Sequence, residues 1–189
     1  MFLWMAVVSC QLAATLESSG RYPVDVVYEL TPASETTILS FTVLETKGTS
    51  VTDLFADGRP VALDRSNAPL IRGETEILEG ATSIEFRYHV GGSTIPLVIL
   101  PVDPGDARPE TFTAAIGLPA GMKLVESFPT RSNESDGRVT FELPIVPAFV
   151  SLTITDEPPL LSVPEWLDLL VLSLLGSVVA VVALVMVRR

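Results

Sequence analysis

The stretch IEFRYHV, residues 84–90, decides the fold class because apolar and polar side chains alternate strictly along it. Successive side chains of a β-strand point to opposite faces, so a period of two predicts a strand with one buried face. The same alternation recurs in Val24–Leu30 and in Leu39–Val43. His89 falls on the polar side of the pattern, so we expect it to face solvent and to have no catalytic role.

Six further apolar stretches complete a set of about nine predicted strands, each bounded by Gly, Pro, Asp or Asn. No stretch of ten or more residues between 21 and 156 keeps a helical period, and Asp57-Gly58 predicts a tight hairpin turn. Short strands separated by frequent turns must bury one face each against a second sheet. The sequence therefore predicts an all-β fold, an immunoglobulin-like antiparallel β-sandwich over residues 21–156. The six further strands are Val51–Phe55, Ile95–Val102, Thr111–Leu118, Lys123–Phe128, Arg138–Leu143 and Phe149–Thr155.

A transmembrane helix is predicted over residues 166–187, because no charged residue occurs from Leu169 to Val187. At about 1.5 Å per residue this uncharged run covers roughly 28 Å, close to the ~30 Å of hydrocarbon in a bilayer. Trp166 suits the headgroup region on one side, and Arg188 and Arg189 suit the cytoplasmic side. We therefore expect the β domain outside the bacterial cell membrane and residues 188–189 in the cytoplasm.

Small residues follow one face of this predicted helix with a spacing of four, which lets helix backbones approach closely in lipid. The alternative is that small residues are simply common in membrane spans. Residues 157–165 contain three prolines and predict a short, stiff tether that holds the domain near the membrane. The residues of the predicted helix-packing face are Ser173, Gly176, Ser177, Ala180 and Ala183.

The N-terminal residues 1–16 form an apolar run of signal-peptide size that is too short to span a bilayer. No Lys or Arg precedes it, and Val7–Cys10 loosely resembles a bacterial lipobox. We expect either a signal peptide or an uncleaved segment in the membrane interface. Cleavage, lipid attachment at Cys10 and retention stay open as alternatives.

Charge and residue usage exclude several functions. Without Arg188 and Arg189 the net charge of −11 becomes −13, so the surface repels phosphate and no nucleic-acid partner is expected. A single cysteine rules out a disulfide within one chain, and a single histidine leaves zinc and copper without their usual ligands. We therefore expect no enzyme activity, cofactor or metal site. One alternative is a calcium site at Asp103, Asp106 and Glu110.

These observations predict a non-catalytic, single-pass accessory or structural subunit of a larger membrane complex. Its expected partners are the lipid bilayer and the transmembrane helices of other subunits. Respiratory and photosynthetic assemblies are one class in which such subunits occur, an argument by analogy. The alternative is a free-standing, surface-anchored module that binds a ligand or a cation through its loops.

Overall fold

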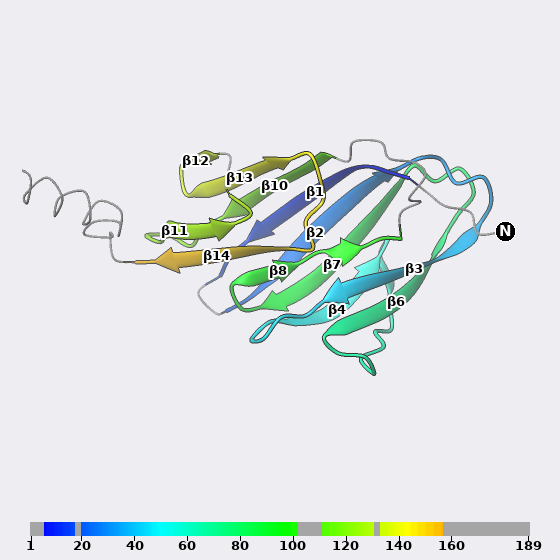
Figure 1. Cartoon of the computed structure of the whole chain (residues 1–189), viewed down its shortest axis with the longest axis horizontal. Helices are drawn as coiled ribbons and strands as arrows, with labels where there is room; N and C mark the ends of the chain where they lie inside the picture. Colours follow the sequence, from blue (N-terminus) through cyan, green and yellow to red (C-terminus); the bar gives the residue numbers. More distant parts are fainter. Residues whose placement is uncertain (1–5, 18–19, 102–110, 131–132, 157–189) are drawn as a thin grey trace, which may run out of the picture. The chain divides into compact units, whose positions relative to one another are not determined.

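Strands make up most of the chain that the computed structural model describes, namely residues 6–17, 20–101, 111–130 and 133–156 (Figure 1). These ranges contain no helix, and so none long and apolar enough to cross a membrane. The all-β class predicted from the alternation is confirmed. The predicted tether, transmembrane helix and cytoplasmic end, residues 157–189, lie outside the described residues.

Fourteen strands form three sheets in the described part of the chain. The large sheet has the order β12 (Asn133–Ser135), β13 (Arg138–Leu143), β10 (Thr111–Gly117), β1 (Val7–Thr15), β2 (Arg21–Leu30), β7 (Ser83–Gly91), β4 (Ser50–Ala56) and β5 (Arg59–Pro60). One small sheet has the order β11 (Lys123–Phe128), β14 (Phe149–Thr155) and β8 (Thr94–Pro96). The other has the order β6 (Leu70–Ile77), β3 (Thr37–Leu44) and β9 (Val98–Ile99).

The N-terminal apolar run, for which we expect a signal peptide or an uncleaved interfacial segment, contains a strand in the structure. Its residues 7–15 form β1 in the middle of the large sheet, antiparallel to β2 and parallel to β10. Cys10 and Leu12 point into the core, whereas Gln11 and Ala13 point outward, so the run hides a period of two. The β domain thus begins before residue 21, and its β1–β10 pair departs from the purely antiparallel pattern that we predicted.

The strand count exceeds the nine that we predicted because several strands carry weak signals. β5, β8, β9 and β12 have only two or three residues each. β6 reads LIRGETEI, in which Gly73 and four polar residues hide the alternation. Phe41 of β3 lies over Gly73, where an added Cβ would come within 2.4 Å of the Phe41 Cζ atom. The glycine is therefore required by close packing between the two strands.

The predicted turn at Asp57-Gly58 is confirmed. Both residues have positive φ angles, 47° and 74°, and they connect β4 to β5. Two consecutive positive φ angles are the signature of the type I′ turn, which matches the twist of a hairpin.

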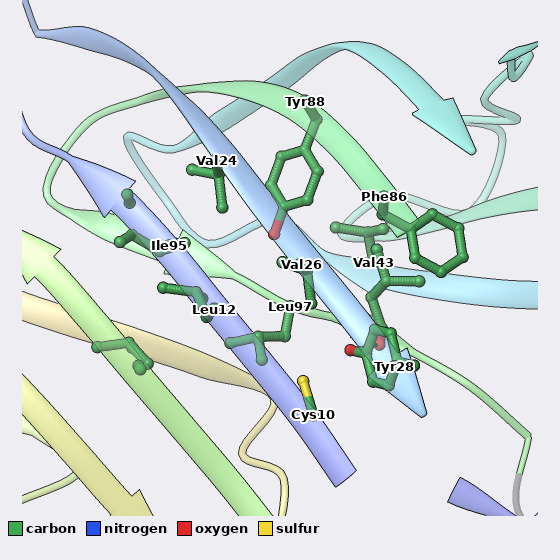
Figure 2. Close-up of a cluster of buried hydrophobic side chains, with 14 of the residues drawn as sticks. Cys10, Leu12, Val24, Val26, Tyr28, Val43, Phe86, Tyr88, Ile95 and Leu97 are labelled. Carbon is green, nitrogen blue, oxygen red and sulfur yellow. Dashed lines mark hydrogen bonds between the residues drawn. The ribbon is translucent and has the colours of Figure 1, made fainter. Parts of the chain in front are cut away.

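The inner face of the large sheet and both small sheets share one apolar core (Figure 2). Val24, Val26 and Phe86 of the large sheet are fully buried, as are Val43 of β3 and Val150 of β14. The two small sheets therefore lie on the same side of the large sheet. This arrangement resembles a β-sandwich, with the other face of the large sheet exposed to solvent.

All three tyrosines of the chain connect the large sheet to the segment that crosses the core. Tyr22 and Tyr28 of β2 donate their hydroxyl groups to the carbonyl oxygens of Gly92 and Val98. Tyr88 of β7 donates to the carbonyl of Pro96 at 2.5 Å. Buried polar groups need partners, so these bonds both satisfy the hydroxyls and hold residues 92–98 against the large sheet.

Candidate functional site

The outer face of the large sheet contains a shallow trough along β1 and β10. Ala13 of β1 lies opposite Ala115 of β10, and Gln11 lies opposite Thr113 in the next row of the same face. These short side chains leave a hollow of about 700 Å³ above the sheet. Its lining comes from β1, β2, β10, β12 and β13.

The flanking strands β2 and β13 form the walls of the trough. Asp25 and Val27 line it on the β2 side, whereas Thr140 and Glu142 line it on the β13 side. The two flanking strands are three strand spacings apart, or roughly 14 Å. An extended peptide fits this width, and a helix of about 10–12 Å diameter also fits.

An ion-pair network extends the outer face beyond the β2 wall. The Arg87 guanidinium donates through Nε to Asp25 at 2.6 Å and through Nη2 to Glu85 at 3.1 Å. The hydrogen bond to Asp25 and the two nearby carboxylates raise the pKa of Arg87. Asp25 is thereby held in place at the edge of the trough, and it shares the charge of Arg87 with Glu85.

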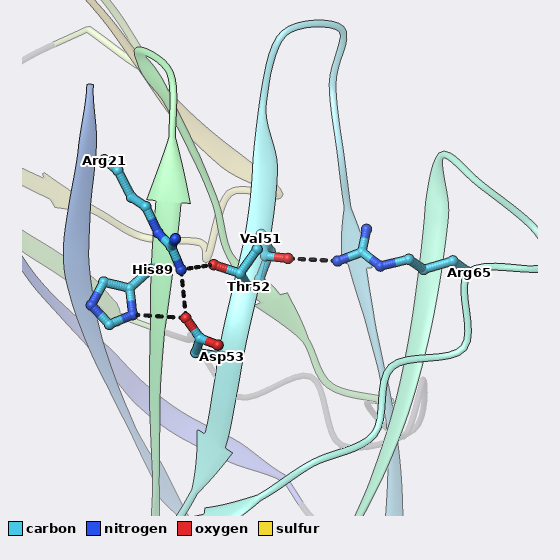
Figure 3. Close-up of polar contacts among 6 residues, drawn as sticks. All are labelled: Arg21, Val51, Thr52, Asp53, Arg65 and His89. Carbon is cyan, nitrogen blue, oxygen red and sulfur yellow. Dashed lines mark hydrogen bonds and ion pairs between the residues drawn. The ribbon is translucent and has the colours of Figure 1, made fainter. Parts of the chain in front are cut away.

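A second polar cluster surrounds a bulge in the β4–β7 pair (Figure 3). Arg21 Nη2 donates to the Thr52 hydroxyl at 2.6 Å and to Asp53 Oδ2 at 2.5 Å. Asp53 has a φ angle of 52°, in the left-handed region that Asp tolerates better than most residues. The bulge places the carboxylate between Arg21 and the only histidine, His89.

His89 lies on the outer face, as its position in the alternation predicts, and its side chain is 41% exposed. Its Nδ1 atom lies 3.6 Å from Asp53 Oδ2, and in the described residues no group is close enough to hydrogen-bond this nitrogen. Activation of a hydroxyl nucleophile needs a base within hydrogen-bond distance. The neighbouring Thr52 hydroxyl instead accepts a hydrogen bond from Arg21, so this geometry does not resemble a nucleophile with its base.

The start of β4 is held by a carboxylate and a guanidinium from neighbouring loops. The N–H of Val51 donates to Glu45 Oε1 at 2.7 Å, and the carbonyl of Val51 accepts from Arg65 Nη2 at 2.5 Å. Arg65 Nη1 also lies 2.8 Å from Glu45, which closes the arrangement. These contacts fix the backbone immediately before the bulge at Asp53.

Most of the sites predicted from the sequence fall outside the described residues. This holds for the helix-packing face from Ser173 to Ala183 and for Trp166, Arg188 and Arg189 at the membrane interface. It also holds for the calcium candidates in the loop 102–110. Among the residues that the structure does describe, no three His, Cys, Asp or Glu side chains lie close enough to hold a metal ion.

The trough itself was not predicted from the sequence. Its floor comes partly from β1, for which the sequence alone favours an export signal or an interfacial segment. The available signal was the alternation of Ser9, Gln11 and Ala13 with Cys10 and Leu12. The partner strand β10 pairs with β1 across about a hundred residues, a contact that no local pattern reveals.

Comparison with known proteins gives structural likenesses only. No family model and no curated protein matches this sequence. An M1 zinc metallopeptidase from Deinococcus radiodurans is 17% identical, with a TM-score of 0.40 over 78% of this chain and 42% of that chain. Yeast LTA4 hydrolase is 14% identical, with a TM-score of 0.47 over 84% of this chain and 30% of that chain.

A putative nutrient binding protein from Legionella pneumophila is 10% identical, with a TM-score of 0.43 over 79% of this chain and 66% of that chain. The chain spans less than half of the metallopeptidase and of the hydrolase. These identities and scores are too low for any argument about function.

Proposed function

We propose that this chain is a non-catalytic, single-pass membrane protein that acts as an accessory subunit of a larger membrane complex. In this proposal the β domain, an immunoglobulin-like sandwich in architecture, lies on the outer side of a bacterial cell membrane. Residues 166–187 form its transmembrane helix, and the C-terminus lies in the cytoplasm. The uncharged run of the sequence from Leu169 to Val187 supports the membrane anchor.

The observation that carries the proposal is the trough on the exposed face of the large sheet. Ala13 and Ala115 form a low floor in the middle of a wide polar surface. A partner element that enters the trough would contact several strands at once. We propose that the trough receives a segment of a partner subunit, while the helix face at Gly176 and Ala180 contacts a partner helix.

Extraction in mild detergent followed by native sizing tests the proposal. We expect the chain to co-purify with other membrane proteins in a complex larger than the chain alone. Replacing Gly176 and Ala180 together by Leu fills the small helix face and should release the chain from the complex. A native chain that elutes alone, without co-purifying proteins, would contradict the proposal.

Substitutions in the trough separate the role of the domain from that of the helix. Ala13→Trp and Ala115→Trp fill the floor from the solvent side, so we expect weaker association without loss of folding. Ile38→Trp is the matched control, because Ile38 is 69% exposed on another sheet. Equal complex yield for all three variants would argue against the trough as the docking surface.

A second function is favoured by the same trough: a free-standing, surface-anchored module that binds a soluble ligand. Gln11, Thr113 and Thr140 offer amide and hydroxyl groups to such a ligand. This alternative predicts that the Leu substitutions at Gly176 and Ala180 leave function intact. It also predicts that Ala13→Trp abolishes function in the isolated, detergent-solubilised chain.

A further inference from the structure

Large apolar side chains are exposed on the small sheet that ends the described domain. Phe128 of β11 is 58% exposed, although aromatic side chains of this size are normally buried or half-buried. Val125 on the same strand is 51% exposed, and Ile145, in the loop that leads into β14, is 66% exposed. Phe128 lies against Phe149 of β14, with ring centroids 5.3 Å apart.

The register places this aromatic pair on the outer face of the small sheet. Phe128 pairs with Ser151, and Phe149 points to the same side because it is two residues away along β14. Val150 and Leu152 point to the other side and are buried in the core. Phe128 is therefore an exposed aromatic side chain on this face, and the half-buried Phe149 packs beside it.

The remaining side chains of this outer face are small or balanced in charge. Lys123 and Glu126 of β11 bring one charge of each sign, and Thr153 of β14 lies opposite Glu126. The face is thus close to neutral, on a chain whose net charge is −11. A neutral face can approach lipid headgroups, whereas an acidic surface is repelled by anionic lipids.

The position of β14 in the sequence also favours the lipid bilayer as the partner of this face. β14 ends at Thr155, and residues 157–165 lead to Trp166 at the start of the apolar run. A chain of nine residues reaches no more than about 32 Å. In the proposed function the membrane anchor therefore keeps the C-terminal end of β14 near the bilayer.

We propose that the outer face of the β11–β14–β8 sheet lies against the lipid bilayer, with the exposed Phe128 inserted at the headgroup level and the half-buried Phe149 packed beside it. The proposal rests on the membrane anchor described under the proposed function and adds the orientation of the domain. In this orientation β14 runs roughly parallel to the membrane surface. Aromatic side chains favour this interfacial depth, about 5–10 Å into the headgroup and acyl boundary.

Site-specific quenching in vesicles tests this orientation. The full chain, carrying Cys10→Ala, is reconstituted in vesicles of phosphatidylcholine and phosphatidylglycerol, and an environment-sensitive fluorophore is attached at Phe128→Cys. Ser151→Cys provides a second probe on the same face, in case the first variant fails to fold. Ile38→Cys, an exposed apolar position on another sheet, is the matched control. Quenching by nitroxide-labelled lipid is compared with quenching by aqueous iodide.

We expect several-fold stronger quenching by the labelled lipid at positions 128 and 151 than at position 38, and the reverse order with iodide. If the chain floats with the vesicles but iodide quenches all three probes equally, the orientation is wrong and the anchor stands. If both quenchers fail at position 128, a protein surface covers the face instead, which also overturns the proposal. If the chain does not float with the vesicles, both the anchor and the orientation fail.

Discussion

The two faces of the large sheet come from the same strands but have opposite compositions. The inner face of β2 and β7 carries Val24, Tyr28 and Phe86, all buried to 1% exposure or less. The outer face of the neighbouring strands carries small and polar side chains such as Ala13 and Gln11. Stability depends on the inner face, so the outer face is free to carry a binding surface.

The largest expected difference between the two faces comes from truncating an inner aromatic residue. Phe86 is fully buried and packs edge-on against Tyr28 and Phe41, with ring centroids 5.9 Å and 5.0 Å away. Phe86→Ala should lower the free energy of unfolding by about 3–5 kcal/mol, because it leaves a cavity in close-packed surroundings. Urea unfolding of the full chain in mild detergent, monitored by circular dichroism, measures the loss in the free energy of unfolding.

Thr113→Ala on the trough floor is the control for this experiment. Its side chain is exposed, so we expect a change of no more than about 0.5 kcal/mol. Equal losses for the inner and outer variants would show that the two faces do not differ in their contribution to stability.

The second prediction concerns β1, in which buried and exposed side chains alternate within an apolar run. Cys10 is fully buried, so Cys10→Ser should cost roughly 1–3 kcal/mol by placing a hydroxyl in apolar surroundings. Ser9→Ala, one residue away on the outer side, should have a much smaller effect. In the native chain the Cys10 thiol should react with alkylating reagents only after unfolding.

Mass spectrometry of the mature chain independently tests whether β1 belongs to the folded domain. If β1 is part of the folded domain, residues 7–15 remain in the mature protein. A mature chain that begins after Thr15 would remove the central strand and contradict the structure of the large sheet.

The contrast between β7 and β1 explains how much of the fold the sequence could predict. In β7, large apolar residues alternate with charged ones, so the strand and its buried face follow from local pattern. In β1, small residues such as Ala13 occupy the outer positions, and an apolar export signal is an equally good interpretation. Its parallel pairing with β10 brings together distant segments and depends on tertiary packing that local sequence does not contain.

The candidate sites divide in the same way. The outward position of His89 could be predicted because it depends only on the alternation of buried and exposed positions along one strand. The cluster around Asp53 could not, since the bulge depends on how β4 pairs with β7. The trough likewise depends on the order of β10, β1 and β2, which is set only when the sheet is assembled.

The buried tyrosines predict a loss of stability in alkaline solution. Burial raises the pKa of Tyr22, and burial together with nearby Cys10 and Tyr22 raises the pKa of Tyr88. In the unfolded chain both phenols lose their protons near the ordinary value of about 10. Their contribution is therefore complete below pH ~10 and falls above it, by about 1.4 kcal/mol per pH unit for each tyrosine.

Tyr22→Phe provides the matched comparison for this effect. It removes the hydrogen bond to Gly92, so the variant is less stable at neutral pH. Its stability should nevertheless fall less steeply than that of the native chain above pH ~10. Urea unfolding at a series of pH values compares the two slopes, and identical slopes would show that Tyr22 ionises normally in the folded state.

The smallest expected effects lie in the exposed cluster at the bulge, where backbone geometry and charge can be separated. Arg21 and Asp53 side chains are both 55% exposed, so their ion pair should contribute no more than about 1 kcal/mol and should weaken in high salt. Asp53→Asn removes the charge but keeps a side chain that tolerates the left-handed φ angle of 52°. Asp53→Val also removes the charge, but it places a β-branched side chain at this left-handed φ angle. That change in backbone compatibility should cost roughly 1–2 kcal/mol. Unfolding in low and high salt should therefore rank the native chain close to Asp53→Asn, with Asp53→Val clearly below. If the Asn variant is as unstable as the Val variant, the charge and not the bulge conformation determines the stability of this edge of the outer face.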